Sequence, residues 1–80
     1  MRALTTQQIK AARMLLGWDQ IRLAVESGLS PVTIKRIEAC PGPVQTTEKT
    51  QAKIREALER AGIVFLFPTR TAGVGVRLST

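Results

Sequence analysis

The sequence predicts a mainly α-helical domain of four short helices, followed by a short C-terminal β-hairpin. Three observations predict this class. Apolar residues recur at helical spacing through the first three quarters of the chain, glycines and prolines divide that span into segments, and apolar residues alternate with others near the C-terminus. We expect residues 1–62 to form the helical domain and residues 63–80 to form the hairpin as a dimerisation element.

The first helix is expected to begin at Thr5 or Thr6 and to end at Gly17. Thr5 and Gln8 have the spacing of a capping box, in which each side chain bonds the backbone of the other residue. Ile9, Ala12 and Leu16 then fall on one helix face, which is the expected inner face.

Two short amphipathic helices, about 20–27 and 31–39, are expected next, with a sharp turn at Gly28. A glycine suits this turn because the residue that ends a helix there needs a positive φ. Asp19 and Ser30 are the expected N-caps, and Pro31 fits the first turn of the following helix, where no backbone donor is needed. This helix-turn-helix layout makes DNA the first partner to test.

The last part of the chain contains one more helix and two strands. Pro41-Gly42-Pro43 forces a loop, and a fourth helix is expected from about Thr47 to Gly62. An apolar run over 63–67, a turn at 68–73 and strict alternation over 74–78 predict a β-hairpin. Two strands alone are marginally stable, so the hairpin should either dock on the helices or pair with a second copy, and we prefer the second copy.

Composition narrows the possible functions. The 80 residues include 12 Lys and Arg against 6 Asp and Glu, for a net charge of +6, which suits a polyanionic partner such as double-stranded DNA. There is no histidine and only one cysteine, so no metal site, cofactor or small-molecule substrate is expected, and an enzyme is the least favoured class. We expect no membrane association and a cytoplasmic location, because no apolar run resembles a signal peptide or a membrane span.

Several motifs resemble a known family of regulators. They are Leu-Thr-x-x-Gln at 4–8, Ala-x-x-Leu-Leu-Gly-Trp-x-Gln at 12–20, Leu-Ala-x-x-x-Gly-Leu-Ser at 23–30 and Thr-Ile-x-Arg-Ile-Glu at 33–38. Residues 4–62 thereby resemble the phage-repressor or Xre type of helix-turn-helix transcriptional regulator, in its small stand-alone bacterial form. The resemblance implies a compact lambda-repressor-like fold, a homodimer and an inverted-repeat operator, as for a repressor.

The resemblance also assigns roles to individual residues. Gln20 falls where the family has a glutamine that bonds a DNA phosphate, and Pro31, Val32, Thr33 and Arg36 fall where its recognition helix faces base edges. Arginine can bond guanine in a bidentate manner, and valine can pack on a thymine methyl, so we expect Arg36 to carry most of the specificity. Lys35 is expected on phosphate, and Ser30 is counted among the DNA-facing residues at the helix start. Arg13 and Glu38 match a structural pair of the family, and Gly28 is structural as well.

One departure from the family favours a different class of function. Ile21 and Val25 are apolar where polar residues are common, and Pro31 and Val32 add apolar surface beside them. Exposed apolar patches usually bind protein. The alternative is therefore a helix-turn-helix that sequesters another regulator through Ile21, Val25 and Val32, as an antiactivator or antitoxin-like partner.

Overall fold

The computed structural model describes residues 4–67 and 73–79. In these residues, four helices precede two strands, as the sequence predicts. The elements are α1 (Thr6–Leu16), α2 (Gln20–Ser27), α3 (Pro31–Ala39), α4 (Glu48–Arg60), β1 (Ile63–Leu66) and β2 (Gly75–Leu78).

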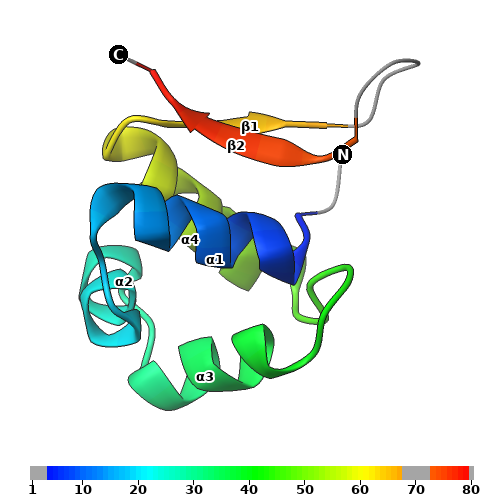
Figure 1. Cartoon of the computed structure of the whole chain (residues 1–80). Helices are drawn as coiled ribbons and strands as arrows, with labels where there is room; N and C mark the ends of the chain where they lie inside the picture. The colour runs from blue at the N-terminus through cyan, green and yellow to red at the C-terminus, as the bar shows by residue number, and fades with distance from the viewer. Residues whose placement is uncertain (1–3, 68–72, 80) are drawn as a thin grey trace.

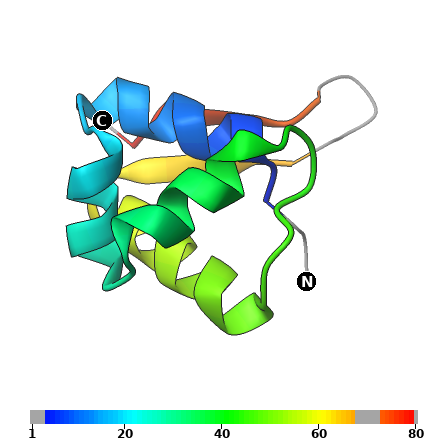
Figure 2. The ribbon, with the colours of Figure 1, turned by 90° about the horizontal axis from the view of Figure 1, so that it is seen from below.

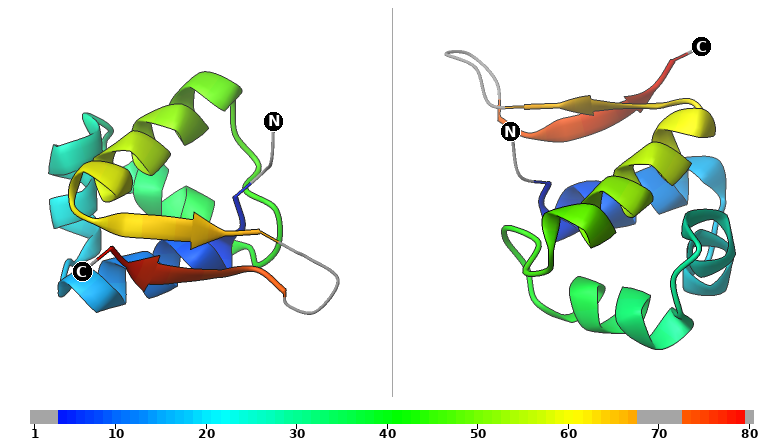
Figure 3. Two further views of the ribbon diagram at one scale, coloured as in Figure 1. Left: turned by 90° about the horizontal axis from the view of Figure 1, so that it is seen from above. Right: turned by 180° about the vertical axis from the view of Figure 1, so that it is seen from behind.

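The helices and the hairpin form two layers. The hairpin lies across α1 and α4 at the top of Figure 1, and α3 lies at the opposite end of the molecule, with α2 joining the two ends. Figure 2 shows α3 from below, and Figure 3 (left) shows the two strands spread over the helices from above. A face of α3 therefore points away from the sheet.

Short-range capping sets the helix starts. Thr5 forms a full capping box with Gln8, and the side chains of Asp19, Ser30 and Thr47 each accept a hydrogen bond from a backbone N–H in the following first turn. These bonds satisfy donors that have no partner inside the helix. The predicted N-caps are thus confirmed.

Two glycines end the first two helices where the sequence predicts them. Gly17 has a φ of 69° and Gly28 a φ of 73°, both in the left-handed region, and a Cβ at either position would meet no atom within 4 Å. Backbone conformation, and not crowding, therefore favours glycine there. α4 ends slightly before the predicted Gly62, with Ala61 as its C-cap.

The predicted hairpin is confirmed, with strands shorter than the predicted segments 63–67 and 74–78. β1 and β2 pair antiparallel, with Ile63 opposite Leu78 and Phe65 opposite Val76. Most of the predicted turn, at 68–72, lies outside the described residues. The hairpin docks on the helices, which is one of the two predicted alternatives, since Ile63 and Phe65 belong to the hydrophobic core. The preferred alternative, pairing with a second copy, stays a prediction.

A buried glutamine joins the hairpin to α1. Gln8 is 2% exposed, and its Nε2 donates to the carbonyls of Leu66 at 2.9 Å and Gly75 at 3.1 Å. Its Oε1 accepts from the backbone N–H of Thr5 at 2.9 Å. The same side chain therefore closes the N-terminal cap of α1 and fixes both strands.

The core lies between the helices and the inner face of the hairpin. It contains Ile9 and Ala12 of the predicted inner face of α1, while Leu16 of that face is partly buried and packs against it. The core also contains Leu4 and Val44 from the segments before α1 and α4. Its fully buried large aliphatic side chains are Leu4, Ile9, Leu23, Ile34, Ile54 and Leu58. No helix of the described residues is long and apolar enough to cross a membrane.

Candidate nucleic-acid interface

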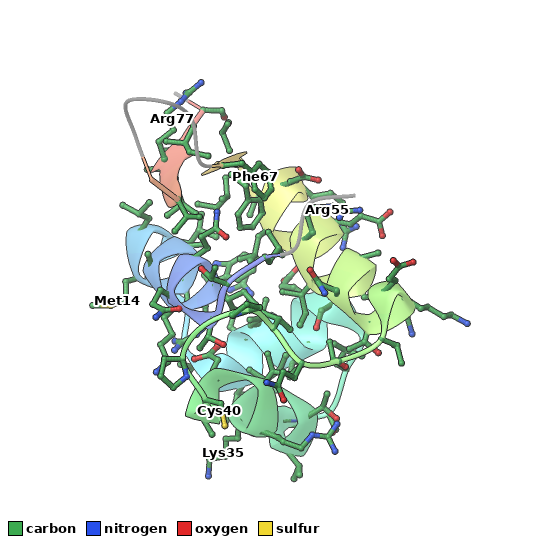
Figure 4. The ribbon with its side chains drawn as sticks, turned by 90° about the vertical axis from the view of Figure 1, so that its right-hand side faces the viewer. Met14, Lys35, Cys40, Arg55, Phe67 and Arg77 are labelled. Carbon is green, nitrogen blue, oxygen red and sulfur yellow. The ribbon has the colours of Figure 1, made fainter. Side chains whose placement is uncertain are left out.

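The outer face of α3 is exposed along its length. Ile34 and Ile37 are buried on the inner face, at 0% and 5% exposure. Pro31, Val32, Lys35 and Arg36 are exposed on the outside. Figure 4 shows Lys35 pointing away from the molecule at the end opposite the hairpin residue Arg77. One helix therefore has an apolar side that fixes it and an accessible side with two cations.

The two cations on α3 differ in their pairing from the arginines of α1 and α2. In the ranges that the structure describes, neither Lys35 nor Arg36 forms an ion pair, whereas Arg13 and Arg22 each pair with a glutamate. An exposed, unpaired cation on a convex helix can reach a phosphate or a base edge without first breaking an internal bond. The geometry leaves both side chains available for a polyanion.

The hydroxyl groups at the start of α3 bond to each other. Ser30 Oγ accepts from the backbone N–H of Thr33 at 3.1 Å and lies 2.9 Å from Thr33 Oγ1. Thr33 is half-buried, in contrast to Val32, which is 73% exposed. The Ser30 side chain thus serves as the helix cap. Val32 offers a larger accessible surface than Thr33.

The start of α2 lies beside the start of α3 and presents backbone donors. The Asp19 side chain accepts a hydrogen bond from the backbone N–H of Arg22 at 2.7 Å, and its backbone carbonyl accepts one from the N–H of Leu23 at 3.2 Å. Within the described part of the chain, the N–H groups of Gln20 and Ile21 have no hydrogen-bond acceptor. Unpaired N–H groups at a helix N-terminus are suited to an anion such as a phosphate.

A buried ion pair fixes α1 and α2 against the end of α3. Arg13 Nε donates to Glu38 Oε2 at 2.8 Å, and Arg13 Nη2 donates to Oε1 at 2.7 Å. The Glu38 side chain is 1% exposed, and it also accepts from Gln20 Nε2 at 3.2 Å. The structure therefore brings Arg13, Glu38 and Gln20 together, and it directs one amide hydrogen of Gln20 inward.

A groove of about 550 Å³ separates the starts of α2 and α3. It is lined by Arg13, Asp19, Gln20, Ile21, Pro31, Val32 and Lys35. The structure thus places most of the predicted DNA-binding residues around one groove. Arg36 lies one turn further along α3, beside a smaller hollow of about 190 Å³ that Cys40, Pro43 and Gln45 also line.

Gln45 is a candidate contact that the sequence analysis did not identify. It is exposed in the loop between α3 and α4, and it lines the same hollow as Arg36. The sequence suggests only that Pro41-Gly42-Pro43 interrupts the helices, and a single glutamine after such a loop gives no signal of its own. Its position depends on how the loop returns beside α3.

The apolar residues of the alternative function are accessible. Ile21, Val25 and Val32 are 62%, 71% and 73% exposed. Ile21 and Val32 line the groove together, whereas Val25 lies one turn further along α2 and does not line it. The three residues of the predicted patch are therefore exposed, and two of them, Ile21 and Val32, line the same groove.

Comparison with known proteins identifies the family of this segment. A search of curated proteins found no match. Residues 9–39, which run from α1 to the end of α3, match the protein-family model described as Helix-turn-helix, a DNA-binding regulatory family and not an enzyme family. Capped helices, a glycine turn and an exposed outer face of α3 are the features expected of such a segment. Residues 9–39 therefore match the helix-turn-helix segment of Xre-type, or lambda-repressor-like, regulators.

Proposed function

We propose that this protein is a sequence-specific transcriptional regulator that binds an inverted-repeat operator as a homodimer, as a repressor does. The observation that carries the proposal is the outer face of α3, where Val32, Lys35 and Arg36 are exposed while the opposite face is fixed in the core. An exposed helix face of this kind fits the major groove of DNA.

The residues around the groove take different roles in this proposal. Arg36 reads a guanine and Val32 packs on a thymine methyl, because both side chains are exposed on α3 one turn apart. Lys35 and the free N–H groups at the start of α2, those of Gln20 and Ile21, bind phosphates and set the docking position. Phosphate contacts position the protein, and base contacts give it sequence preference.

Selection of bound sites from random DNA duplexes tests the proposal directly. A dimer of this fold is expected to recover a palindrome whose half-sites lie about one helical turn, roughly 34 Å, apart. Binding should weaken with added salt, with a log–log slope of roughly −0.9 per phosphate neutralised. No enrichment at low ionic strength would contradict the assignment.

Two substitutions distinguish base recognition from phosphate binding. Arg36→Ala should relax the base preference at one position of each half-site, at a cost of about 1–3 kcal/mol against the preferred base. Lys35→Ala should weaken binding to all sequences alike and lower the salt slope by about 1. Lys53→Ala, on α4 and outside the groove, is the matched control and should leave both quantities unchanged.

A second candidate function rests on the apolar pair in the groove. Ile21 and Val32 expose large apolar side chains on the surface assigned to DNA, and such surfaces commonly bind protein. In that case the domain sequesters another regulator. Ile21→Asp would then abolish binding to that partner, and DNA binding would be absent or insensitive to salt. Enrichment of a palindrome that Arg36→Ala degrades would instead exclude this role.

A further inference from the structure

The two strands of the hairpin are not equally covered. On the face toward the helices, β1 places Ile63 and Phe65, which are 3% and 9% exposed. Their partners on β2 are Leu78, which is 38% exposed, and Val76, which is half-buried. Val74, directly before β2, is 44% exposed. The apolar layer beneath the sheet is therefore complete under β1 and incomplete under β2.

Among the residues that the structure describes, β2 pairs with β1 alone, so the incomplete side is also an open sheet edge. The N–H of Ser79 donates to the carbonyl of Gly62 at 2.7 Å, so the residues opposite each other at this pair exchange backbone bonds. Because such pairs alternate in an antiparallel ladder, Val76 and Leu78 direct their N–H and C=O groups away from β1. An open edge of this kind is completed by another strand.

Apolar residues of α1 continue this surface below the edge. Leu15 follows Gln8 by seven residues and so lies on the same helix face, which is the face that Gln8 turns toward the hairpin. Leu15 remains 46% exposed, and Met14 beside it is 78% exposed. Figure 4 shows Met14 extending outward from α1 below β2.

We propose that a second copy of this chain completes the sheet by antiparallel pairing of β2 with β2, to give a four-stranded sheet across the dimer. This inference rests on the proposed homodimer and specifies its interface. A second copy is the occupant that fits, because it brings both a free strand edge and the matching exposed residues Val74, Leu78 and Leu15. Each copy then covers the incomplete apolar layer of the other.

Charge selects the register of this pairing. If Arg77 stood on the two-fold axis, it would face Arg77 of the second copy, and like charges directly opposite are destabilising. If Val76 stands on the axis, Arg77 faces Gly75, Val76 faces Val76, and Val74 faces Leu78 of the second copy. This register keeps the outward-directed backbone groups paired and separates the two guanidinium groups. We therefore place Val76 on the axis.

The pairing agrees with the position of α3. The two-fold axis of an antiparallel strand pair runs perpendicular to the sheet, and α3 lies at the end of the molecule away from the sheet (Figure 1, and Figure 3 at right). In the dimer both copies of α3 therefore face the same side. This is the arrangement that an inverted repeat on one face of DNA requires.

Disulfide trapping tests both the interface and its register. With Cys40→Ser as background, Val76→Cys should form a covalent dimer under mild oxidation, because opposite hydrogen-bonded residues have Cα atoms about 5.5 Å apart, within the range of a disulfide. Arg77→Cys in the same background should cross-link more slowly, because its diagonal partner is about 7–8 Å away. Faster trapping at Arg77 would overturn the register, and no trapping at either position would overturn the interface.

Sedimentation of substituted full-length chains gives a second measurement. Val76→Lys should weaken dimerisation by roughly ten-fold or more, because it places two ammonium groups at the axis. Val64→Thr, on the outer face of β1, is the control and should leave the dimer intact, because it adds no charge opposite Arg77. Circular dichroism verifies that both variants fold. Dimers that Val76→Lys leaves unchanged would overturn this interface alone, whereas trapped dimers that select no DNA site would overturn the proposed function and leave the interface standing.

Discussion

The start of α3 and the hairpin are held in different ways. At the start of α3, the stabilising hydrogen bonds join residues three or four positions apart, such as Ser30 with Thr33 and Ser30 with Ile34. The hairpin depends on Gln8, whose bonds to Leu66 and Gly75 span 58 and 67 residues. The surface assigned to DNA is thus built mainly from local contacts, and the surface assigned to dimerisation from distant ones.

This difference predicts separable behaviour. Local caps can form whenever their helix forms, but the hairpin needs α1 in place before its strands gain a buried polar anchor. Loss of the anchor should therefore loosen the hairpin without disturbing α2 and α3. Three substitutions test whether the two regions are stabilised independently.

The largest effect is expected at Glu38. Its ion pair with Arg13 spans 25 residues, so it is a distant contact in the region that otherwise depends on local ones. Glu38→Gln should lower the free energy of unfolding by about 3 kcal/mol, since it leaves the largely buried Arg13 guanidinium without its counter-charge. Urea unfolding measures the loss. Glu56→Gln, at an exposed position of α4, is the control and should be close to neutral. A loss below about 1 kcal/mol would mean that local caps alone hold this end of the molecule.

A smaller and more localised effect is expected at Gln8. Gln8→Ala should cost about 2 kcal/mol, because a buried amide with three backbone partners disappears. Hydrogen exchange should accelerate at β1 and β2 while α2 and α3 keep their protection. Lys10→Ala, exposed on the same helix, supplies the reference. Equal acceleration in α3 and the hairpin would show that the two regions open as one unit.

The smallest effect is expected at Ser30. Ser30→Ala removes the N-cap of α3 and should lower the free energy of unfolding by about 1 kcal/mol. Ser30→Asp retains a capping oxygen and should restore most of that stability. Thermal unfolding compares the two variants. A full loss in both would point to the hydroxyl bond with Thr33, and not to the cap, as the stabilising contact.

The same division explains what the sequence could predict. The starts of the helices follow from Thr5, Asp19, Ser30 and Thr47, because a cap acts on the residues that directly follow it. The apolar run over 63–67 and the alternation over 74–78 predict the two strands for the same local reason. Contacts between residues that are far apart in the sequence could not be predicted in this way.

The bonds of Gln8 to the hairpin and of Gln20 to Glu38 carry no sequence signal, because their partners are brought close only by the tertiary fold. The position of Gln45 beside Arg36 has the same origin. The sequence could therefore suggest which helix face is exposed, but not which neighbouring loop shares it.

The exposure of Val32, Lys35 and Arg36 has a consequence for evolution. These side chains contribute little to the core, whereas Ile34, Ile37 and Glu38 on the same helix are buried. Surface substitutions away from caps and buried networks usually change stability by less than about 0.5 kcal/mol. Under the proposed function, a duplicated copy of this gene can therefore diverge at three positions and acquire new targets while its scaffold stays under unchanged selection.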